Sequence, residues 1–213
     1  MAAFDLWQRG GAGARRSRCN SARGAGPSQI ESSMCTVVKF YSKSADKGDL
    51  DAALGNWRQY LSNFAVCPTP IVVDIAAVAG QHLSPQKLTF PSVEHGFHAL
   101  KYTYTSRADV ALRFQDLHNV PTPLEAKRLG SKKQMKMRYQ TALRMSDWNQ
   151  VRVAVMETLI RARFEQDQRF RDILRAVHAK GWTLVHHERG GDKAFWGNRH
   201  NALGKILMEY ARK

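Results

Sequence analysis

Three residues in the middle of the chain have types and spacing that could do acid–base or nucleophilic chemistry. Glu94, His98 and Lys101 follow one another at intervals of four and three residues, so on a helix their side chains project from one side. A carboxylate two turns from a lysine can act as acid or base beside an amine nucleophile. The same spacing also fits a solvated helix face with an ordinary ion pair. A metal site at His95 and His98 is disfavoured, because the HExxH order of zinc-binding helices is absent.

A second set of chemically useful residues lies in the segment GGDKAFWGNRHN. Its glycines, Gly190, Gly191 and Gly197, permit close approach of the backbone to a ligand. Asp192 supplies a carboxylate and Trp196 offers a plane for stacking. The alternative is a connecting loop whose tryptophan is anchored in the core, and no phosphate-loop consensus is met.

The chain is unusually basic, with 33 Lys and Arg against 18 Asp and Glu and a net charge of +15. Seven of these cations, and no acid, lie between Lys127 and Arg144. Such a cluster could pair with phosphates, although runs of this kind are usually solvated surface. The charge favours an anionic partner, such as a phosphorylated small molecule, nucleic acid or an acidic surface, without choosing among them.

The composition is that of a globular protein. With 213 residues, 43% of them hydrophobic and 24% charged, the chain fits neither a disordered protein nor a disulfide scaffold. No apolar run is long enough to cross a membrane, so no membrane partner is expected. The three cysteines form no CxxC pair, which favours reduced thiols in the cytoplasm and disfavours structural zinc. We therefore expect no metal and no cofactor.

Residues 1–35 differ in composition from the rest of the chain. The stretch RGGAGARRSRCNSARGAGPSQ within them is built from Gly, Ala, Ser and Arg and has almost no large apolar residue, so it cannot bury enough surface to offset the entropy lost on ordering. We predict a disordered basic tail, followed by one domain over residues 36–213. The alternatives for the tail are an organelle transit peptide and an upstream start, with Met34 as a second initiation residue.

These residues must be positioned by helices and strands. The helices and strands that the sequence predicts indicate a single α+β domain, mostly helical, with a small β-sheet. A helix over 92–105 has Ser92 as its N-cap and apolar residues on one face. The longest helix, over 146–166, begins at Ser146 or Asp147, and the ring of Trp148 is expected to pack inward. Further helices are expected over 107–117, 124–130, 167–180 and 202–213, with a short one within 42–64, and strands over 37–41, 71–78, 87–90 and 182–188.

Six separated blocks of the sequence occur in a particular order. They are FYS…LSNF, FPSVEHGFHALKY, EAKRLG, DWNQVRVAVMETLIRARFEQ, LVHHERGGDKAFWG and LGKILME. From Phe40 to Glu209 this string resembles the YbiA-like, or NADAR, family, whose best known members are riboflavin-biosynthesis-intermediate N-glycosidases. The resemblance implies hydrolysis of the N-glycosidic bond of phosphorylated ribosyl-aminopyrimidines, with release of ribose 5-phosphate. Other members of the family remove ADP-ribose from a guanine base.

The resemblance also implies roles for single residues. Glu94 and Lys101 fall on the Glu and Lys of the family's EHxxxAxK block, and Asp192 falls on the Asp that precedes its WG pair. An N-linked ribose can leave by an oxocarbenium-like path assisted by a carboxylate. It can also open its ring and be captured by a lysine as an imine. On the second path Lys101 is the Schiff-base nucleophile, Glu94 the proton shuttle, and Asp192 holds ribose hydroxyls or assists proton transfer.

The remaining candidate residues are expected to bind the substrate. Asn63 and Phe64 fall on the family's SNF element, and Trp196 and Gly197 on its WG pair. The rings of Phe64 and Trp196 would wall the base. We add three further candidates: Trp148, and, for the phosphate, Lys127 or Arg128.

Three departures from the family pattern bear on the substrate. The loop after the WG pair is short, Gly96 and Phe97 replace the aromatics that often follow the Glu-His pair, and residues 75–86 lengthen the early hairpin. The alternative function is therefore removal of ADP-ribose from a nucleobase or nucleic acid, or hydrolysis of another nucleotide derived from NAD or ADP-ribose. A binding module without catalysis is disfavoured because Glu94, Lys101 and Asp192 are all present.

Overall fold

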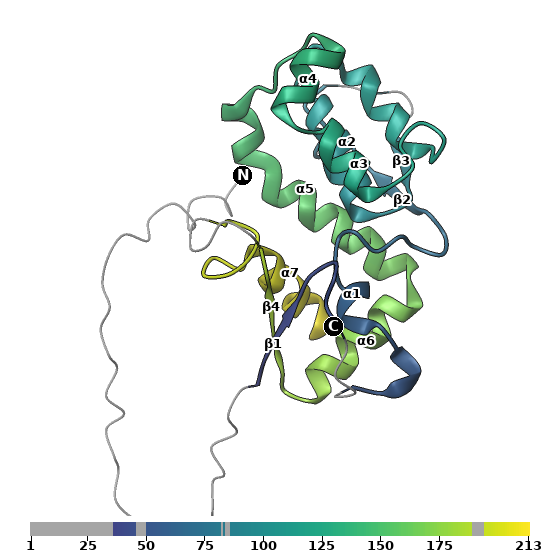
Figure 1. Ribbon diagram of the computed structural model, residues 1–213, viewed down its shortest axis with the longest axis vertical. Helices are drawn as coiled ribbons and strands as arrows, with labels where there is room; N and C mark the ends of the chain where they lie inside the picture. Colours follow the sequence, from purple (N-terminus) through teal and green to yellow (C-terminus); the bar gives the residue numbers. More distant parts are fainter. Residues whose placement is uncertain (1–35, 46–49, 82, 84–85, 189–193) are drawn as a thin grey trace, which may run out of the picture. The chain divides into compact units, whose positions relative to one another are not determined.

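The computed structural model describes residues 36–45, 50–81, 83, 86–188 and 194–213. They belong to one compact unit, Cys35–Lys213. The fold is α+β and mostly helical, as expected (Figure 1). In chain order its elements are β1 Val37–Phe40, η1 Ala52–Leu54, α1 Trp57–Tyr60, β2 Ile71–Asp74, β3 Lys87–Phe90, α2 Val93–Tyr102, η2 Ala108–Gln115, α3 Pro123–Leu129, α4 Lys132–Tyr139, α5 Met145–Gln166, α6 Gln168–Ala179, β4 Thr183–His186 and α7 Ala202–Ala211.

The long helix α5 organises the domain. It contacts α2 and β2 along one part of its length and α6 and α7 along another. In Figure 1 it passes, in green, between a group formed by α2, α3, α4 and the β2–β3 ribbon and a group formed by α1, α6, α7 and the β1–β4 pair. Residues from both groups can therefore reach side chains on α5.

The strands pair as two separate two-stranded sheets among the described residues, where the sequence suggested one small sheet. β2 and β3 form the expected antiparallel ribbon, with Ile71 opposite Phe90. β1 pairs in parallel with β4, so that Phe40 lies opposite His186. This second pairing joins the start of the domain to its last strand.

Helix α2 is the most deeply buried element of the domain. Its N-cap is Ser92, as predicted, whose Oγ accepts a hydrogen bond from the backbone N–H of His95. Every residue of α2 except Lys101 is buried. Gly96 permits close contact with α5, since a Cβ there would lie 2.4 Å from Cδ2 of Leu159. The polar residues of α2 therefore lie in the interior rather than on a solvated face, which excludes the ordinary surface ion pair.

The fully buried Arg163 of α5 holds the segment that precedes the site. Its guanidinium donates to the carbonyl oxygens of Tyr60 at 2.8 Å and Ser62 at 3.3 Å, and its Nε donates to Asp167 Oδ2 at 3.2 Å. Because a buried charge is tolerated only when it is paired and hydrogen-bonded, this network fixes the backbone on both sides of residue 61. The residue after Ser62 is Asn63, whose backbone carbonyl oxygen accepts a hydrogen bond from the backbone N–H of Glu94 at 3.0 Å.

Three details of the predicted elements need correction. The basic stretch contains a helix, α4, which the charge pattern hid because only Met135 and Tyr139 turn inward. Helix α5 begins at Met145 with Arg144 as its N-cap residue, whereas Ser146 or Asp147 was the expected cap. Residues 108–115 form a 3-10 helix. The predicted tail, residues 1–35, lies outside the described residues. No helix in the described ranges is long and apolar enough to cross a membrane.

Candidate active site

Glu94, His98 and Lys101 form a continuous chain of hydrogen bonds on one face of α2. The imidazole of His98 donates from Nε2 to Glu94 Oε1 at 3.1 Å, and Lys101 Nζ donates to its Nδ1 at 3.1 Å. Glu94 and His98 are buried, and Lys101 is half-buried. The spacing that suggested these residues thus places an amine, an imidazole and a carboxylate in series.

The surroundings set the protonation state of each member. Burial lowers the pKa of His98, and the neighbouring Lys101 lowers it further against the opposing effect of Glu94, so the ring is neutral. Burial alone would raise the pKa of Glu94, but the hydrogen bond from His98 and the cations Lys127 and Lys101 more than offset it, and the net shift is downward. Glu94 is therefore ionised at neutral pH.

Lys101 has the properties of an amine nucleophile. Its Nζ lies 5.2 Å from the centre of the Phe97 ring and 5.9 Å from that of Trp148. Desolvation by these surroundings lowers the pKa of Lys101 to about 8, against the stabilising charge of Glu94 and with a further contribution from Lys127. A sizeable fraction of the amine is therefore neutral near physiological pH, as imine formation requires.

The pKa of Lys101 gives a prediction for stability. A lysine in the unfolded chain has a pKa near 10.4, so between pH 8 and about 10.4 the unfolded state binds more protons and the free energy of unfolding rises with pH. Relative to Lys101→Met, the wild type should gain up to about 3 kcal/mol over this range, measured by urea unfolding at pH 7 and pH 10. The exposed Lys133 provides the control: the free energy of unfolding of Lys133→Met should change with pH as that of the wild type does. The same pH dependence in Lys101→Met as in the wild type would contradict the pKa shift.

Asn63 and Phe64 lie beside Glu94, as the sequence suggested. Asn63 is buried and donates from Nδ2 to the sulfur of Met156 at 3.5 Å. Its Oδ1 is buried without a hydrogen-bond partner among the described residues. Because a buried polar atom without a partner is unfavourable, Oδ1 is a natural acceptor for a ligand N–H or O–H. Phe64 is half-buried, and Lys127 Nζ lies 5.4 Å from the centre of its ring.

The two cations predicted to bind phosphate differ in position. The charge of Lys127 lowers the pKa values of Glu94, His98 and Lys101, so it lies close enough to act on the hydrogen-bonded chain. Arg128 instead makes a two-point ion pair with Glu125, at 2.7 and 2.5 Å, and is exposed. The structure therefore brings Lys127 to the site and does not bring Arg128 there.

Aromatic side chains from three segments surround the lysine. Phe97 of α2 makes edge contacts with Trp148 of α5, at 5.1 Å between ring centres, and with Trp196, at 5.4 Å. Trp148 is buried and Trp196 is half-buried. Both predicted tryptophans thus meet at the ring next to Lys101. Asp192, the third predicted catalytic residue, lies outside the described residues, as do Gly190 and Gly191.

Gly197 is required where the chain after β4 doubles back. A Cβ at this position would lie 2.4 Å from the carbonyl oxygen of His186 and 2.8 Å from Cβ of Glu188. Asn198 reinforces the approach with a backbone hydrogen bond of 2.8 Å to the same carbonyl. The glycine therefore serves the close approach of two backbone segments, which sets the position of Trp196.

Two basic residues of the site were missed by the sequence analysis. The guanidinium of Arg152 lies 4.0 Å above the Phe195 ring, and its Nε is buried without a partner in the described ranges. Burial lowers the pKa of His186 to about 4 despite the opposing charge of Glu94, so this ring is neutral, and its Nδ1 is also buried without a described partner. For Arg152 a signal existed, because it lies one helical turn from Trp148.

The histidine next to Glu94 in the sequence has structural partners. His95 engages both ring nitrogens, with Ser92 Oγ at 2.8 Å and the carbonyl oxygen of Val120 at 3.1 Å. In the part of the chain that the structure describes, no group of three or more His, Cys, Asp or Glu side chains is placed to hold a metal ion. The chemistry available among the described residues is that of an amine, a carboxylate and an imidazole.

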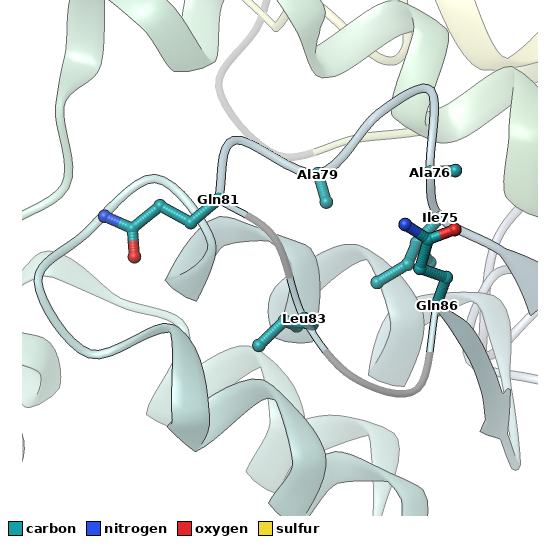
Figure 2. Close-up of a pocket in the computed structure, with 6 residues that line it drawn as sticks. All are labelled: Ile75, Ala76, Ala79, Gln81, Leu83 and Gln86. Atoms are coloured by element: carbon teal, nitrogen blue, oxygen red, sulfur yellow. The ribbon is translucent and has the colours of Figure 1, made fainter.

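A separate cavity of about 170 Å³ lies in the connection between β2 and β3 (Figure 2). Gln81 at its rim donates to the carbonyl oxygen of Thr105 at 2.9 Å. The described lining offers alkyl groups and two amides but no acid, base or cation: Ile75, Ala76, Ala79, Gln81, Leu83 and Gln86. The described lining of this cavity supplies no acid–base chemistry, so the candidate site remains the hydrogen-bonded chain on α2.

Comparison with known proteins identifies the family. The NADAR domain model matches residues 51–213. The N-glycosidase YbiA of Shigella boydii serotype 4 is 31% identical over 175 residues, which cover 82% of this chain and 83% of that protein. The N-glycosidase YbiA of Escherichia coli K12 is 31% identical over 179 residues, with coverage of 82% and 86%. The NMR structure of E. coli YbiA has a TM-score of 0.52 at 27% identity and covers 86% of this chain and 88% of that chain. This confirms the resemblance seen in the sequence, and the chain belongs to the NADAR family.

Proposed function

We propose that the domain over residues 36–213 hydrolyses the N-glycosidic bond of phosphorylated ribosyl-aminopyrimidines, intermediates of riboflavin biosynthesis, and releases ribose 5-phosphate. The coarser assignment, a hydrolase acting on N-glycosyl compounds, follows from the family and from relatives named N-glycosidase. The observation that carries the proposed chemistry is the partly neutral Lys101, hydrogen-bonded through His98 to an ionised Glu94. The choice of substrate is supported by the resemblance to the family.

The arrangement supports a covalent route. When the ribosyl ring opens, C1 becomes an imine of the aminopyrimidine. The lone pair of Lys101 Nζ adds to C1 and forms a new C–N bond. The new Nζ cation loses a proton, which the ionised Glu94 takes up. The bond from C1 to the aminopyrimidine nitrogen then breaks, and that nitrogen leaves with its electron pair and the proton from Glu94. Water hydrolyses the resulting Schiff base, which frees ribose 5-phosphate and regenerates the amine.

Binding of the substrate is supported by the groups that surround Lys101. Phe64, Trp148 and Trp196 offer rings for the base, and the unpartnered Oδ1 of Asn63 is an acceptor for its exocyclic amine. For the phosphate we favour Lys127, because it acts electrostatically on the cluster. Asp192 keeps its proposed role toward the ribose hydroxyls.

Arg152 is the second candidate for the phosphate. It is a cation with a buried Nε that has no partner among the described residues. Desolvation by burial lowers its pKa, an unfavourable setting that a bound dianion would relieve. Arg128 remains a weaker candidate because it is already paired with Glu125.

A second function, removal of ADP-ribose from a nucleobase in nucleic acid, is favoured by one observation. Helix α4 carries four exposed cations and no carboxylate: Lys132, Lys133, Lys136 and Arg138. A polyanion would bind to such a surface through many phosphate contacts, and its affinity would fall steeply as the salt concentration is raised. A small phosphorylated substrate, which touches few cations, would show a shallow salt dependence.

The test is direct. The purified protein is incubated, with and without EDTA, with the two early ribosylated pyrimidine intermediates and with an oligonucleotide ADP-ribosylated on guanine, and released sugar is measured. We expect release of ribose 5-phosphate from an intermediate, undiminished by EDTA and retained in the surface variant Lys133→Met. Release from the oligonucleotide alone would replace the proposal with the second function. Release from no substrate would refute both.

A further inference from the structure

We infer that His98 is a proton relay that couples the nucleophile Lys101 to the carboxylate of Glu94, so that each proton given up by the amine reaches the leaving group through the imidazole. This inference rests on the proposed function and deepens it. The proposed chemistry requires a proton to leave Lys101 as it attacks and another to reach the departing nitrogen. Among the residues that the structure describes, His98 touches both groups.

The hydrogen bonds define a path with a direction. Nδ1 of His98 lies 3.1 Å from Lys101 Nζ, and Nε2 lies 3.1 Å from Glu94 Oε1. In a neutral imidazole one nitrogen carries the proton and the other accepts. Because an ionised carboxylate and a lysine N–H face the two nitrogens, Nε2 carries the proton and Nδ1 is free to accept one from the amine. Proton uptake at Nδ1 and release at Nε2 leave the ring neutral.

The ring is held in place for this path. His98 is buried, and the backbone of Gly130 lies against it so closely that a Cβ there would come within 2.1 Å of Nδ1. The carbonyl oxygen of Gly130 also accepts from Lys101 Nζ at 3.5 Å. Phe97 packs an edge against the imidazole, with ring centres 5.6 Å apart. These contacts prevent the rotation that would exchange the two nitrogens.

The titratable groups facing His98 come from two helices. Glu94 and Lys101 belong to α2, and Lys127 belongs to α3. The two lysines disfavour an imidazolium, whereas Glu94 favours it. Burial has the largest effect and lowers the pKa of His98, so the ring is neutral. A neutral ring between an amine and a carboxylate is what a relay needs, because an imidazolium could not accept from Lys101.

The proton balance closes over one turnover. As the neutral amine adds to the protonated imine at C1, Lys101 Nζ becomes cationic and passes one proton to Nδ1, while the Nε2 proton moves to Glu94. Glu94 gives that proton to the aminopyrimidine nitrogen as its bond to C1 breaks. In hydrolysis the water gives a proton to Glu94. The relay then runs in reverse, protonates Lys101 Nζ as it leaves C1, and restores the starting tautomer. The second proton of the water passes to solvent as the C1 carbonyl forms, and it balances the solvent proton that protonated the imine.

The kinetic test compares two substitutions of His98. His98→Gln keeps a donor and an acceptor but cannot transfer a proton, and we expect kcat to fall by about 10²- to 10³-fold at pH 7 with an unchanged circular dichroism spectrum. In His98→Ala, added imidazole should restore part of the lost rate, which a merely structural role would not allow. The exposed His118→Gln serves as control. An active His98→Gln within threefold of the wild type, or a folded His98→Ala without imidazole rescue, would overturn the relay.

A second readout needs no substrate. In ¹⁵N-labelled wild-type protein, His98 should be neutral and Nε2-protonated at pH 7 to 9, and Lys101→Met should shift the Nδ1 resonance most. An Nδ1-protonated or ordinarily titrating ring would exclude the relay even in a protein that cleaves none of the tested substrates. Absence of cleavage with the expected spectrum would instead count against the proposed function alone.

Discussion

Replacing Lys101 with methionine is expected to lower the release of ribose 5-phosphate by about 10⁴-fold or more, because a covalent nucleophile has no substitute in the reaction. Methionine suits the position, since the side chain lies among Phe97, Trp148 and the backbone of Gly130. The measurement is single-turnover release at pH 8, near the pKa of Lys101. In the wild type the rate should rise with pH until the amine is neutral and level off above about 8.

The covalent intermediate gives this prediction a second measurement. Borohydride added during turnover should reduce the Schiff base and leave a ribose 5-phosphate adduct on the peptide that contains Lys101, detected by its mass. Lys127→Met is the matched control: it removes a cation next to the site, so binding should weaken while the adduct still forms. An unchanged rate in Lys101→Met would eliminate the covalent route and leave the oxocarbenium path, in which Glu94 alone assists departure.

The sequence predicted that Glu94, His98 and Lys101 project from one side of a helix, but not the hydrogen bonds that join them through His98. A period of 3.6 residues is enough to place Glu94, His98 and Lys101 on one side of α2. It could not tell an exposed ion pair from a buried catalytic chain, because that depends on packing by distant segments. Gly96 against α5 and Gly130 against His98 are such contacts.

The parts of the site that sequence reasoning missed depend on tertiary contacts or on surroundings. Arg152 reaches Phe195 from α5, a contact between segments far apart in the chain. His186 lies in the predicted strand over 182–188, and the pattern of that strand did not mark it as a site residue. Its low pKa arises from burial, which the sequence does not show. Conversely, charge alone could not separate Lys127 from Arg128, which Glu125 neutralises on the surface. Helix α4 was hidden by its many cations, which leave only two inward positions to signal a helix.

Replacing Glu94 with glutamine should separate the two halves of the reaction. We expect kcat to fall by about 10³-fold, because the amide can still accept the hydrogen bond from His98 but cannot carry a proton to the leaving nitrogen. Formation of the nucleophile should survive. Glu94 raises the pKa of Lys101, so its loss should lower that pKa further and leave more of the amine neutral at pH 7.

The readout for Glu94→Gln is therefore twofold. Ribose 5-phosphate supplied with borohydride should still label Lys101, and the pH midpoint of labelling should move below that of the wild type, while turnover of the ribosylated pyrimidine collapses. Glu125→Gln, which removes a carboxylate paired with Arg128 outside the cluster, should change neither quantity. Loss of labelling together with turnover would mean that Glu94 only positions Lys101. Retained turnover would mean that the proton of the leaving group comes from another residue, with Asp192 the first to replace.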